Sequence, residues 1–449
     1  MDAFRAGQRS PTEELDAVMG AIQGSELNAF CHLDEDAARQ RAGSADVDLP
    51  FGGLPLAVKE LDPVAGWPLT EASLALQDRV ADHDATVIQR LRQAGAVLCG
   101  QTTASEFGGL NIGVSPLHGV TGNPWNPART TGGSSAGSAA AVAGGLVTLA
   151  TGGDGGGSIR IPAGFCGLVG MKGTAGRIPR GPRTMIAPLT VVLGCLARSV
   201  RDVARYYDVA NGFDPRDPYS LPRIDGWERE LGTHELSGRR AVISPTLGSA
   251  MVRPEVAEVV TSAGEALCRL AGLKTVDVPV KLPGLGFEWA MANLVTLLVE
   301  LGDRYPGCME QMTTEIQFGI TMAAQTYNLE MAARVEEQRT EANEAMAGVF
   351  DQVDFVIAAT NPDVAFPADV SLNTRVGELT VGPENNGALT IPANITGNPA
   401  ISIPAGSVDG LPVGLQVIAR HHQDPLLLDL ALVMEREQPW PLVAPGSPR

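Results

Sequence analysis

A lysine at the end of an apolar segment is the first residue whose type suggests chemistry. Residues 54–59 read Leu-Pro-Leu-Ala-Val-Lys, and Lys59 is one of only four lysines among the 33 basic residues. An ammonium group is costly to bury, and a lysine at a strand end commonly extends its charge to the surface. A desolvated lysine, unlike an arginine, can lose its proton at usable pH and act as a base. Lys59 is therefore either an ordinary strand-end lysine or a general base.

Two adjacent serines in a glycine-rich segment are the second candidate. Residues 131–138 read Thr-Gly-Gly-Ser-Ser-Ala-Gly-Ser and contain Ser134 and Ser135. The segment is compatible with a flexible loop in which a serine caps the alanine-rich helix that follows. Residues 133–137 also match the G-x-S-x-G pattern of a nucleophile elbow, but that motif follows a central strand. The two prolines in residues 123–130 disfavour such a strand, so a third interpretation makes the serines part of a larger site.

A second glycine run precedes a third serine. Residues 152–162 read Gly-Gly-Asp-Gly-Gly-Gly-Ser-Ile-Arg-Ile-Pro, in which the serine is Ser158. Successive N–H groups in such a run can converge on one point, as an oxyanion hole requires. A phosphate-binding loop is the competing interpretation, but the G-K-[ST] ending is missing. Asp154 and Arg160 flank Ser158 with opposite charges and are predicted to form a structural pair that holds the loop.

Together these residues could perform acyl transfer. Ser158 would attack a carbonyl carbon, a serine of the Ser134–Ser135 pair would relay its proton, and neutral Lys59 would accept it. This device needs no histidine. The pair at residues 421–422 (His-His) could instead complete a Ser-His-Asp triad, although its charged surroundings are more typical of a surface.

Composition limits the possible partners. Lys+Arg of 33 against Asp+Glu of 51 gives a net charge of −18, which disfavours nucleic acid and anionic membranes. The first residues lack the apolar core of a signal peptide, and no apolar run approaches the roughly 20 residues of a membrane span. The six cysteines form no CxxC pair and have no histidine at ligand spacing. We therefore expect reduced thiols in a cytoplasmic protein, with no zinc and no disulfides.

The elements that must position these groups alternate between helices and strands. Helices are expected within residues 11–43 and at 85–95, 138–149, 254–270, 286–303 and 322–349. Strands are expected at 51–58, 96–99, 241–244, 274–280 and 355–359, and as a pair at 400–404 and 413–417. No repeat, low-complexity linker or charge block marks a boundary, so one large α/β domain over residues 1–449 is expected.

Several motifs together resemble the amidase signature family. The resemblance spans nearly the whole chain, and the serine-glycine segment carries most of its specificity. The matching segments are residues 27–30, 54–59, 119–127, 132–143, 156–163, 166–172, 396–404 and 411–416.

The resemblance implies a role for each candidate residue. Ser158 would be the nucleophile, Lys59 the general base and Ser134 the bridging serine, usually held by a cis peptide bond. The backbone amides of Gly155, Gly156, Gly157 and Ser158 would form the oxyanion hole. Ser135, Asp154 and Arg160 would support the site structurally.

The family also implies a fold and an activity. The expected fold is α/β, a mixed and mostly twisted central sheet flanked by helices. The signature core would span about 54–180, and a variable, substrate-side helical region about 284–350. The expected reaction is hydrolysis of a small to medium linear amide, with water as acyl acceptor and with neither metal nor organic cofactor. The protein would be a monomer or homodimer that binds neither nucleic acid nor membrane.

Alternatives remain open for the substrate and for the class of function. The same three residues could hydrolyse carbamates or esters, and a non-catalytic scaffold could keep the fold. A glutamine-dependent amidotransferase subunit working with a partner chain is a further alternative, which the acidic charge and residues 184–197 disfavour. Residues 111–115, 184–195 and 300–330 are expected to contribute to the pocket. The departures from the family pattern are Ala136, Gly153, Gly155 and Gly173.

Overall fold

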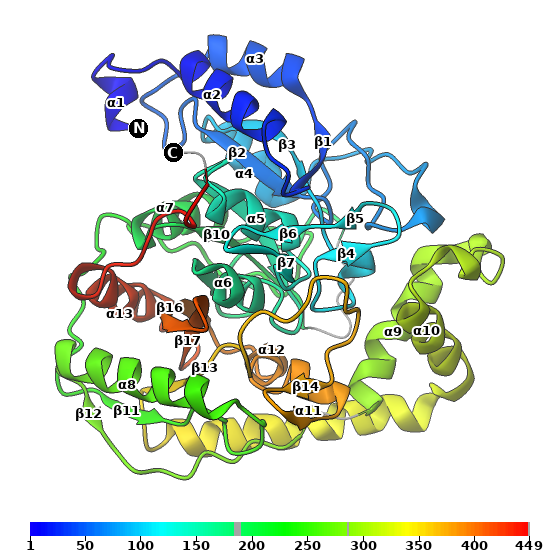
Figure 1. Cartoon of the computed structure of the whole chain (residues 1–449), viewed down its shortest axis with the longest axis vertical. Helices are drawn as coiled ribbons and strands as arrows, with labels where there is room; N and C mark the ends of the chain where they lie inside the picture. The colour runs from blue at the N-terminus through cyan, green and yellow to red at the C-terminus, as the bar shows by residue number, and fades with distance from the viewer. Residues whose placement is uncertain (184–189, 285–286, 448–449) are drawn as a thin grey trace.

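Most of the strands belong to one mixed sheet. The computed structural model describes residues 1–183, 190–284 and 287–447, and within them the sheet has 11 strands in the order β1-β3-β2-β8-β10-β9-β16-β17-β13-β11-β12 (Figure 1). In that order the strands are β1 (Phe30–Leu33), β3 (Val97–Thr102), β2 (Pro55–Lys59), β8 (Leu149–Asp154), β10 (Val192–Ala197), β9 (Val169–Lys172), β16 (Ala400–Val408), β17 (Leu411–Ala419), β13 (Phe355–Ala359), β11 (Arg240–Ile243) and β12 (Lys274–Thr275). The predicted α/β class with a mixed central sheet is confirmed.

Strand β2 lies between two parallel neighbours in the interior of this sheet. It pairs with β3, where Lys59 is opposite Thr102, and with β8, where Ala57 is opposite Ala150. All five residues of β2 are buried, which explains its continuous apolar sequence. Its carboxyl end therefore brings Lys59 close to the end of β8, where the glycine run begins.

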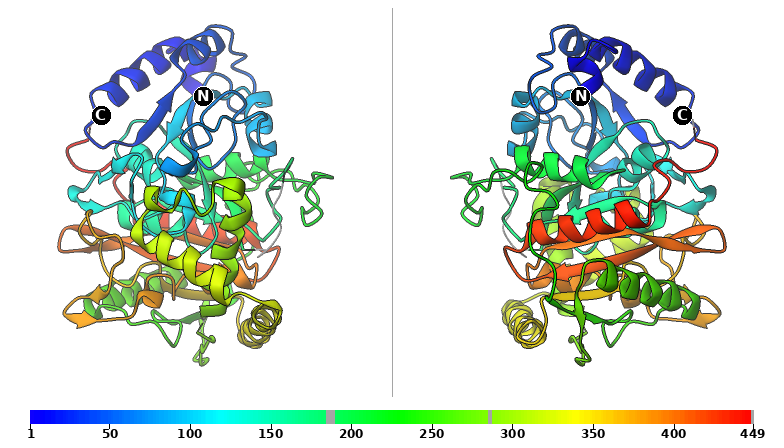
Figure 2. Two further views of the ribbon diagram at one scale, coloured as in Figure 1. Left: turned by 90° about the vertical axis from the view of Figure 1, so that its right-hand side faces the viewer. Right: turned by 90° about the vertical axis from the view of Figure 1, so that its left-hand side faces the viewer.

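Helices cover the sheet and extend beyond it. They are α1 (Asp2–Arg5), α2 (Pro11–Gln23), α3 (Glu35–Gly43), α4 (Thr86–Gln93), α5 (Ala136–Ala143), α6 (Arg160–Cys166), α7 (Val200–Ala210), α8 (Pro254–Leu270), α9 (Phe287–Leu301), α10 (Thr314–Thr326), α11 (Leu329–Phe350), α12 (Ile391–Ile395) and α13 (Asp424–Glu437). In the right-hand view of Figure 2, α8 and α13 lie across the face of β16 and β17. In the left-hand view, α9 and α10 face the reader on the other side of the molecule.

Short elements complete the chain. Among the described residues, three two-stranded sheets consist of β4 (Val114–Ser115) with β5 (Gly119–Val120), β6 (Gly122–Asn123) with β7 (Asn126–Thr130), and β14 (Arg375–Val376) with β15 (Leu379–Thr380). Single 3₁₀ turns are η1 (Leu74–Leu76), η2 (Glu106–Gly108), η3 (Gly302–Arg304), η4 (Met309–Gln311) and η5 (Pro383–Asn386).

The structure confirms some predicted elements in full and corrects others. The predicted helix at 254–270 and strand at 355–359 have the observed bounds. The predicted helix over 322–349 is wrong in part, because α10 ends at Thr326 and the Asn328 side chain caps a new helix by accepting from Met331 N–H. The predicted strand over 274–280 is too long: β12 has two residues, and Pro279 offers no N–H for a ladder.

The N-terminal segment also departs from the expectation of helix alone. The edge strand β1 separates α2 from α3 and pairs antiparallel with β3. Helix α2 begins with a capping box, in which Ser10 and Glu13 bond each other's backbone N–H.

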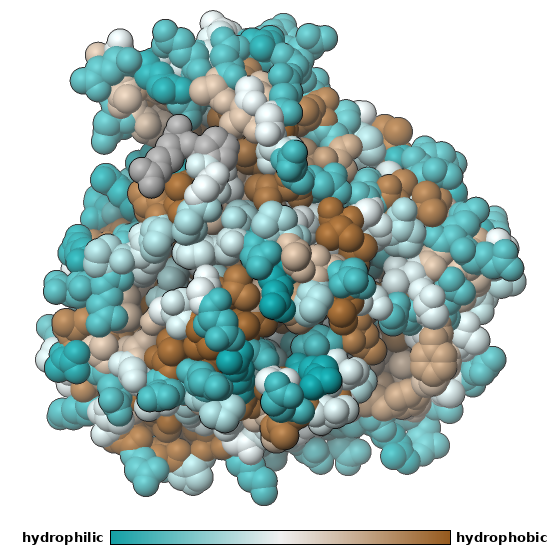
Figure 3. Space-filling model, viewed as in Figure 1, coloured by the Kyte–Doolittle hydropathy of each residue, from teal (hydrophilic) through white to brown (hydrophobic). Residues whose placement is uncertain are grey.

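The surface seen in Figure 3 is largely hydrophilic, with separate apolar areas between polar side chains. Among the described helices, none is both long and apolar enough to cross a membrane.

Candidate active site

Lys59 is buried at the carboxyl end of β2. Its side chain is 2% exposed, and its Nζ donates to Ser134 Oγ at 2.7 Å and to the Gly153 carbonyl at 3.3 Å. The backbone is fixed as well, since Lys59 N–H donates to Thr151 Oγ1 at 2.9 Å. Thr151 in turn donates to the Asp62 carboxylate at 2.6 Å. The lysine is therefore held against a serine hydroxyl rather than extended to the surface.

Burial gives Lys59 the character of a base. Removal from water lowers the pKa of Lys59 to about 8, and the charges of Asp62 and Asp154 offset part of this effect. With this pKa, Lys59 is neutral in about a tenth of the molecules at pH 7. A lysine with this pKa can accept a proton near neutral pH, whereas an ordinary surface lysine stays charged.

The first serine loop leads into the N-terminus of α5. The Gly133–Ser134 peptide bond is cis, the isomer that the family resemblance implied. Gly133 has no room for a side chain, since a Cβ there would collide with the backbone of Ile112. Ser134 is 2% exposed and accepts the hydrogen bond from Lys59. The glycines thus allow a tight backbone that points one hydroxyl at the lysine.

Ser158 follows the second glycine run and precedes α6. It is 5% exposed, and its carbonyl accepts the N–H of Ser135 at 3.2 Å, so the two serine loops are tied together. Lys59, Ser134 and Ser158 all line the same pocket. The structure therefore brings together the three residues that the sequence assigned to catalysis.

The amides of the glycine run have different partners. Gly157 N–H donates to Asp154 Oδ1 at 2.8 Å and so helps to hold the loop. The N–H groups of Gly155, Gly156 and Ser158 have no hydrogen-bond partner among the residues that the structure describes. These three amides, rather than all four predicted ones, are free to bind an oxyanion.

Asp154 and Arg160 form the buried pair predicted from their spacing. Both side chains are fully buried, and Arg160 donates from Nε to Oδ2 at 3.0 Å and from Nη2 to Oδ1 at 2.9 Å. Burial alone would raise the pKa of Asp154, but Arg160 and the Asn394 amide outweigh it and place this pKa well below its usual range. Gln416 and Asn394 accept further guanidinium hydrogens, so the charge pair is well satisfied.

Contacts from distant segments complete the site, and no motif in the sequence signals them. Thr390 Oγ1 donates to the Gly156 carbonyl at 2.7 Å, and Asn394 Nδ2 donates to the Asp154 carbonyl at 2.7 Å. Both residues lie more than 200 positions after the loop they hold. The pairing of β9 with β16, the strand that follows this segment, helps to bring it to the site.

The other candidate nucleophile arrangements are not assembled. Ser135 is fully buried, contributes its backbone N–H to Ser158, and does not line the pocket. The strand before it, β7, pairs with β6 outside the large sheet, so no central strand precedes the serines. His421 bonds the Thr396 carbonyl and His422 contacts Arg177, and neither histidine lines the pocket. The geometry therefore favours the lysine-dependent arrangement.

The pocket has a volume of about 750 Å³ and is larger than the catalytic residues alone require. Trp289, Leu294 and Leu297 of α9 form an apolar wall together with Ile316 of α10. At another part of the lining, Arg79 bridges the carboxylates of two glutamates. These are Glu71 and Glu300. A site of this size and mixed lining accommodates a small to medium organic molecule.

The predicted pocket segments are confirmed in part. Asn111, Thr190, Val191, Leu193, Glu300, Glu315 and Ile316 line the pocket, whereas residues 184–189 lie outside the described part of the chain. Four further apolar or aromatic residues of the 300–330 segment do not line the pocket: Met312, Phe318, Met322 and Tyr327. Phe318 is 65% exposed instead, and Met312 packs in a small core of its own.

The extra glycines differ in the space around them. A Cβ at Gly153 would meet only Leu193 Cδ2, at 3.7 Å, which is an ordinary contact. A Cβ at Gly155 would lie 3.2 Å from Val191 Cγ2, which is tight. A side chain could therefore be accommodated at position 153, while Gly155 lets Val191, the residue before β10, approach the loop closely.

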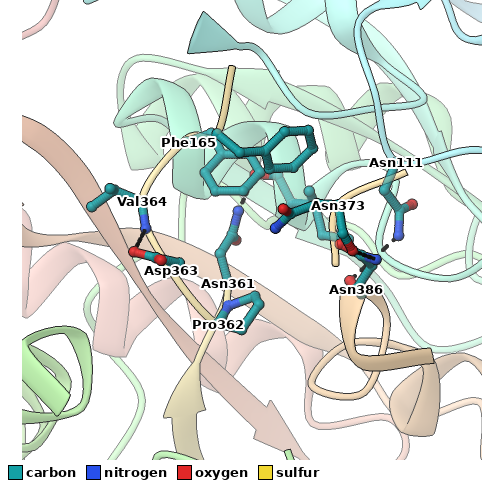
Figure 4. Close-up of a pocket in the computed structure, with 10 residues that line it drawn as sticks. Asn111, Phe165, Asn361, Pro362, Asp363, Val364, Asn373 and Asn386 are labelled. Atoms are coloured by element: carbon teal, nitrogen blue, oxygen red, sulfur yellow. Dashed lines mark hydrogen bonds between the residues drawn. The ribbon is translucent and has the colours of Figure 1, made fainter. Parts of the chain in front are cut away.

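A much smaller cavity adjoins the site (Figure 4). Its volume of about 10 Å³ is room for roughly one water molecule. Asn361 reaches across to the Ile161 carbonyl, and Asn111 donates to the Asn386 carbonyl. Asn111 lines both cavities, but of the two only the larger one is lined by the candidate catalytic side chains Lys59, Ser134 and Ser158.

Comparison with known proteins places the chain in a family. A family model described as Amidase matches residues 15–428, and the chain therefore belongs to the amidase family. A subunit of the glutamyl-tRNA(Gln) amidotransferase of Lacticaseibacillus paracasei is 29% identical over 480 residues, covering 99% of this chain and 97% of that protein.

Solved structures agree with this assignment. A bacterial aryl acylamidase of the amidase signature family has a TM-score of 0.90 at 26% identity, covering 98% of this chain and 95% of that one. The corresponding glutamyl-tRNA(Gln) amidotransferase subunit from Thermotoga maritima has a TM-score of 0.78 at 27% identity, covering 97% and 94%. The predicted family is confirmed, and these matches support hydrolysis of amide C–N bonds in general.

Proposed function

We propose that this protein hydrolyses the C–N bond of a small to medium linear amide through an acyl-enzyme on Ser158. The observation that carries the proposal is the buried 2.7 Å hydrogen bond from Lys59 Nζ to Ser134 Oγ in the pocket that Ser158 also lines. A lysine buried beside a serine has no packing role that an apolar side chain would not fill better. Membership of the amidase family and the similarity to an aryl acylamidase support this assignment.

Acylation would transfer one proton along the three side chains. Ser158 Oγ attacks the carbonyl carbon, its proton passes to Ser134 Oγ, and the Ser134 proton passes to neutral Lys59 Nζ. The negative charge on the former carbonyl oxygen is stabilised by the free amides of Gly155, Gly156 and Ser158. The C–N bond then breaks as Lys59 returns the proton through Ser134 to the departing nitrogen.

Deacylation would use the same relay, with water in place of Ser158 as the attacking group. Water attacks the acyl carbon and gives its proton through Ser134 to Lys59. The bond between the acyl carbon and Ser158 Oγ then breaks as Lys59 returns this proton through Ser134 to Ser158 Oγ, which releases a carboxylic acid and restores the free enzyme. These steps need no metal or organic cofactor. Carbamates and esters present a similar carbonyl and are alternative substrates for the same residues. We further propose that the protein works in the cytoplasm as a monomer or homodimer, without nucleic acid or membrane.

The test combines a substrate panel with active-site labelling. Acetanilide-type amides, aliphatic amides, carbamates and p-nitrophenyl esters are assayed side by side, and a fluorophosphonate probe is located by peptide mass spectrometry. We expect turnover of at least one amide, a burst of p-nitrophenol from esters, and the label on Ser158. Absence of both label and turnover would identify a non-catalytic member of the family.

A second candidate is an amidotransferase subunit that works with a partner chain. The observation in its favour is the near full-length similarity to a subunit of glutamyl-tRNA(Gln) amidotransferase. Such a subunit would release ammonia from the side-chain amide of glutamine and pass the ammonia to an acceptor, rather than release it into solution. Release of glutamate from glutamine, together with co-purification of a partner chain, would favour this function. Turnover of acetanilide-type amides by the isolated chain would favour the first.

A further inference from the structure

Three side chains with metal-ligating atoms meet outside the catalytic pocket. Cys31 lies on the edge strand β1, Glu60 follows the last residue of β2, and His118 lies in the turn between β4 and β5. Successive side chains along a strand point to opposite sides, so Glu60 faces away from the site that Lys59 enters. None of these three described residues lines the catalytic pocket.

The three groups are close enough to share one ion. The sulfur of Cys31, a carboxylate oxygen of Glu60 and a ring nitrogen of His118 all lie within 4.8 Å of one another. His118 Nε2 and Glu60 Oε2 are 2.8 Å apart. The carboxylate is 2% exposed, whereas the imidazole is 17% exposed and gives access from solvent.

Surrounding hydrogen bonds hold two of these groups in place. Ala104 N–H donates to Glu60 Oε1 at 2.7 Å, and Thr70 Oγ1 donates to Glu60 Oε2 at 3.2 Å. The His118 turn is fixed by Asn28, whose side-chain amide donates to the His118 carbonyl at 2.7 Å. Partners of this kind orient the ligands of metal sites and add to their affinity.

The donor atoms select a class of metal. One thiolate, one imidazole and one carboxylate suit a borderline-soft ion such as Zn²⁺ far better than Mg²⁺ or Ca²⁺, which prefer oxygen alone. Thiolate and carboxylate together balance the two positive charges. Tetrahedral donors with Zn²⁺ bonds of roughly 2.0–2.3 Å lie further apart than the 2.8 Å between His118 Nε2 and Glu60 Oε2. Small side-chain rotations must therefore separate these two atoms and direct all three donors at one point.

We propose that Cys31, Glu60 and His118 bind one Zn²⁺ ion, with water as the fourth ligand. On binding, the Cys31 thiol releases its proton to solvent as the S–Zn bond forms, and neutral His118 coordinates through a ring nitrogen. The ion joins β1, the residue after β2 and the β4–β5 hairpin, and it takes no part in acyl transfer. The site is therefore independent of the proposed hydrolase activity.

The experiment measures metal binding by the full chain after treatment with a chelator and desalting. Zn²⁺ is titrated in competition with a chromophoric chelator, and Co²⁺ is added as a spectroscopic probe. We expect one Zn²⁺ per chain, a thiolate-to-cobalt charge-transfer band and the intense visible bands of a tetrahedral ion. Cys31→Ser should remove the charge-transfer band, and Cys31→Ser and His118→Gln should each weaken Zn²⁺ binding at least about tenfold.

Matched variants separate this site from other cysteines and histidines. Cys308→Ser and His83→Gln should keep the affinity and the cobalt spectrum of the unmodified chain, and Ser158→Ala should bind Zn²⁺ unchanged. If Cys31→Ser or His118→Gln fails to fold, Glu60→Gln replaces it, because this substitution keeps the shape of the side chain but removes its charge. It should also weaken Zn²⁺ binding. The proposal is overturned if the unmodified chain binds no Zn²⁺ at micromolar concentration, if its Co²⁺ spectrum shows no thiolate band, or if folded Cys31→Ser binds as tightly.

Discussion

The catalytic loops and the helical wall are built in opposite ways. The catalytic loops (residues 131–135 and 152–158, with Lys59) are largely buried; a backbone hydrogen bond from Ser135 to Ser158 ties them together, and the buried pair of Asp154 with Arg160 holds the second loop. The helical wall (α9 and α10) lines the same pocket but leaves large apolar side chains in solvent, including Val299 at 74% and Phe318 at 65% exposed.

The difference separates chemistry from selectivity. A proton relay works only when its members stay within hydrogen-bond distance, so every neighbour of the loops is constrained. A wall that contacts the substrate by apolar surface needs only approximate shape and tolerates many sequences. We therefore expect substitutions in the loops to affect all substrates and substitutions in the wall to affect some.

The largest effect is expected from Ser158→Ala. Loss of the attacking oxygen should lower kcat by at least about 10⁴-fold for every substrate, measured as product release under saturating conditions. The fold should be unchanged, because the side chain is small and lies at the pocket surface.

Ser135→Ala is the matched control for the nucleophile. Ser135 directly follows Ser134 and is buried like it, but Ser135 does not line the pocket. It should keep fluorophosphonate labelling at Ser158. An active Ser158→Ala with an inactive Ser135→Ala would return the nucleophile elbow as the correct arrangement.

Lys59→Arg should lower kcat/KM by about 10³-fold, since a guanidinium keeps its charge and cannot accept the proton. Because burial lowers the pKa of Lys59 to about 8, kcat/KM of the unmodified enzyme should rise with pH up to this value and then level off. The residual activity of Lys59→Arg should lack this rise. Lys274→Arg, at an exposed position, serves as control, and an unchanged pH profile in Lys59→Arg would remove the lysine from the mechanism.

Asp154→Asn should mainly affect stability, by about 3–5 kcal/mol, because it leaves the buried Arg160 charge unpaired. The folded-state pKa of Asp154 is lowered, so its contribution is complete above the usual aspartate range and is lost as pH falls below it. Urea unfolding from pH 7 down to acid should show this loss in the parent and not in the variant.

Asp78→Asn is the control for that experiment. Asp78 pairs with Arg304 at 2.8 Å on the surface, where it is 67% exposed, so its replacement should leave the free energy of unfolding nearly unchanged. Equal stability of Asp154→Asn and Asp78→Asn would show that the loop does not depend on the buried pair.

The same contrast explains what the sequence could predict. Lys59, Ser134 and Ser158 can be recognised in the sequence because each stands in a short motif. Lys59 ends an apolar strand, and each serine lies in a glycine-rich segment. The Asp154–Arg160 pair was also local, since its partners are six positions apart. By contrast, the prediction that Gly157 is an oxyanion donor is not supported, because Gly157 N–H donates to the Asp154 carboxylate. The sequence of the glycine run does not reveal this hydrogen bond.

Long-range contacts explain the rest. Thr390 and Asn394 contact the second loop over more than 200 positions of sequence. No local pattern around these two residues predicts such contacts. The expectation that no cysteine lies near a histidine ligand considered neighbours in sequence, whereas Cys31 and His118 meet through β1 and the β4–β5 hairpin. The break between α10 and α11 was missed because Asn328 interrupts a pattern that is otherwise continuously helical.

The smallest effect is expected from Trp289→Ala in the helical wall. Removing the indole enlarges the pocket, so the kcat/KM ratio of aryl to small aliphatic amides should fall by about tenfold. Labelling of Ser158 by a small fluorophosphonate should persist, since no catalytic group is touched. Val299→Ala is the matched control, because Val299 lies on the same helix but is 74% exposed. If Trp289→Ala slowed every substrate and the labelling by one common factor, the wall would belong to the catalytic loops and the separation of chemistry from selectivity would fail.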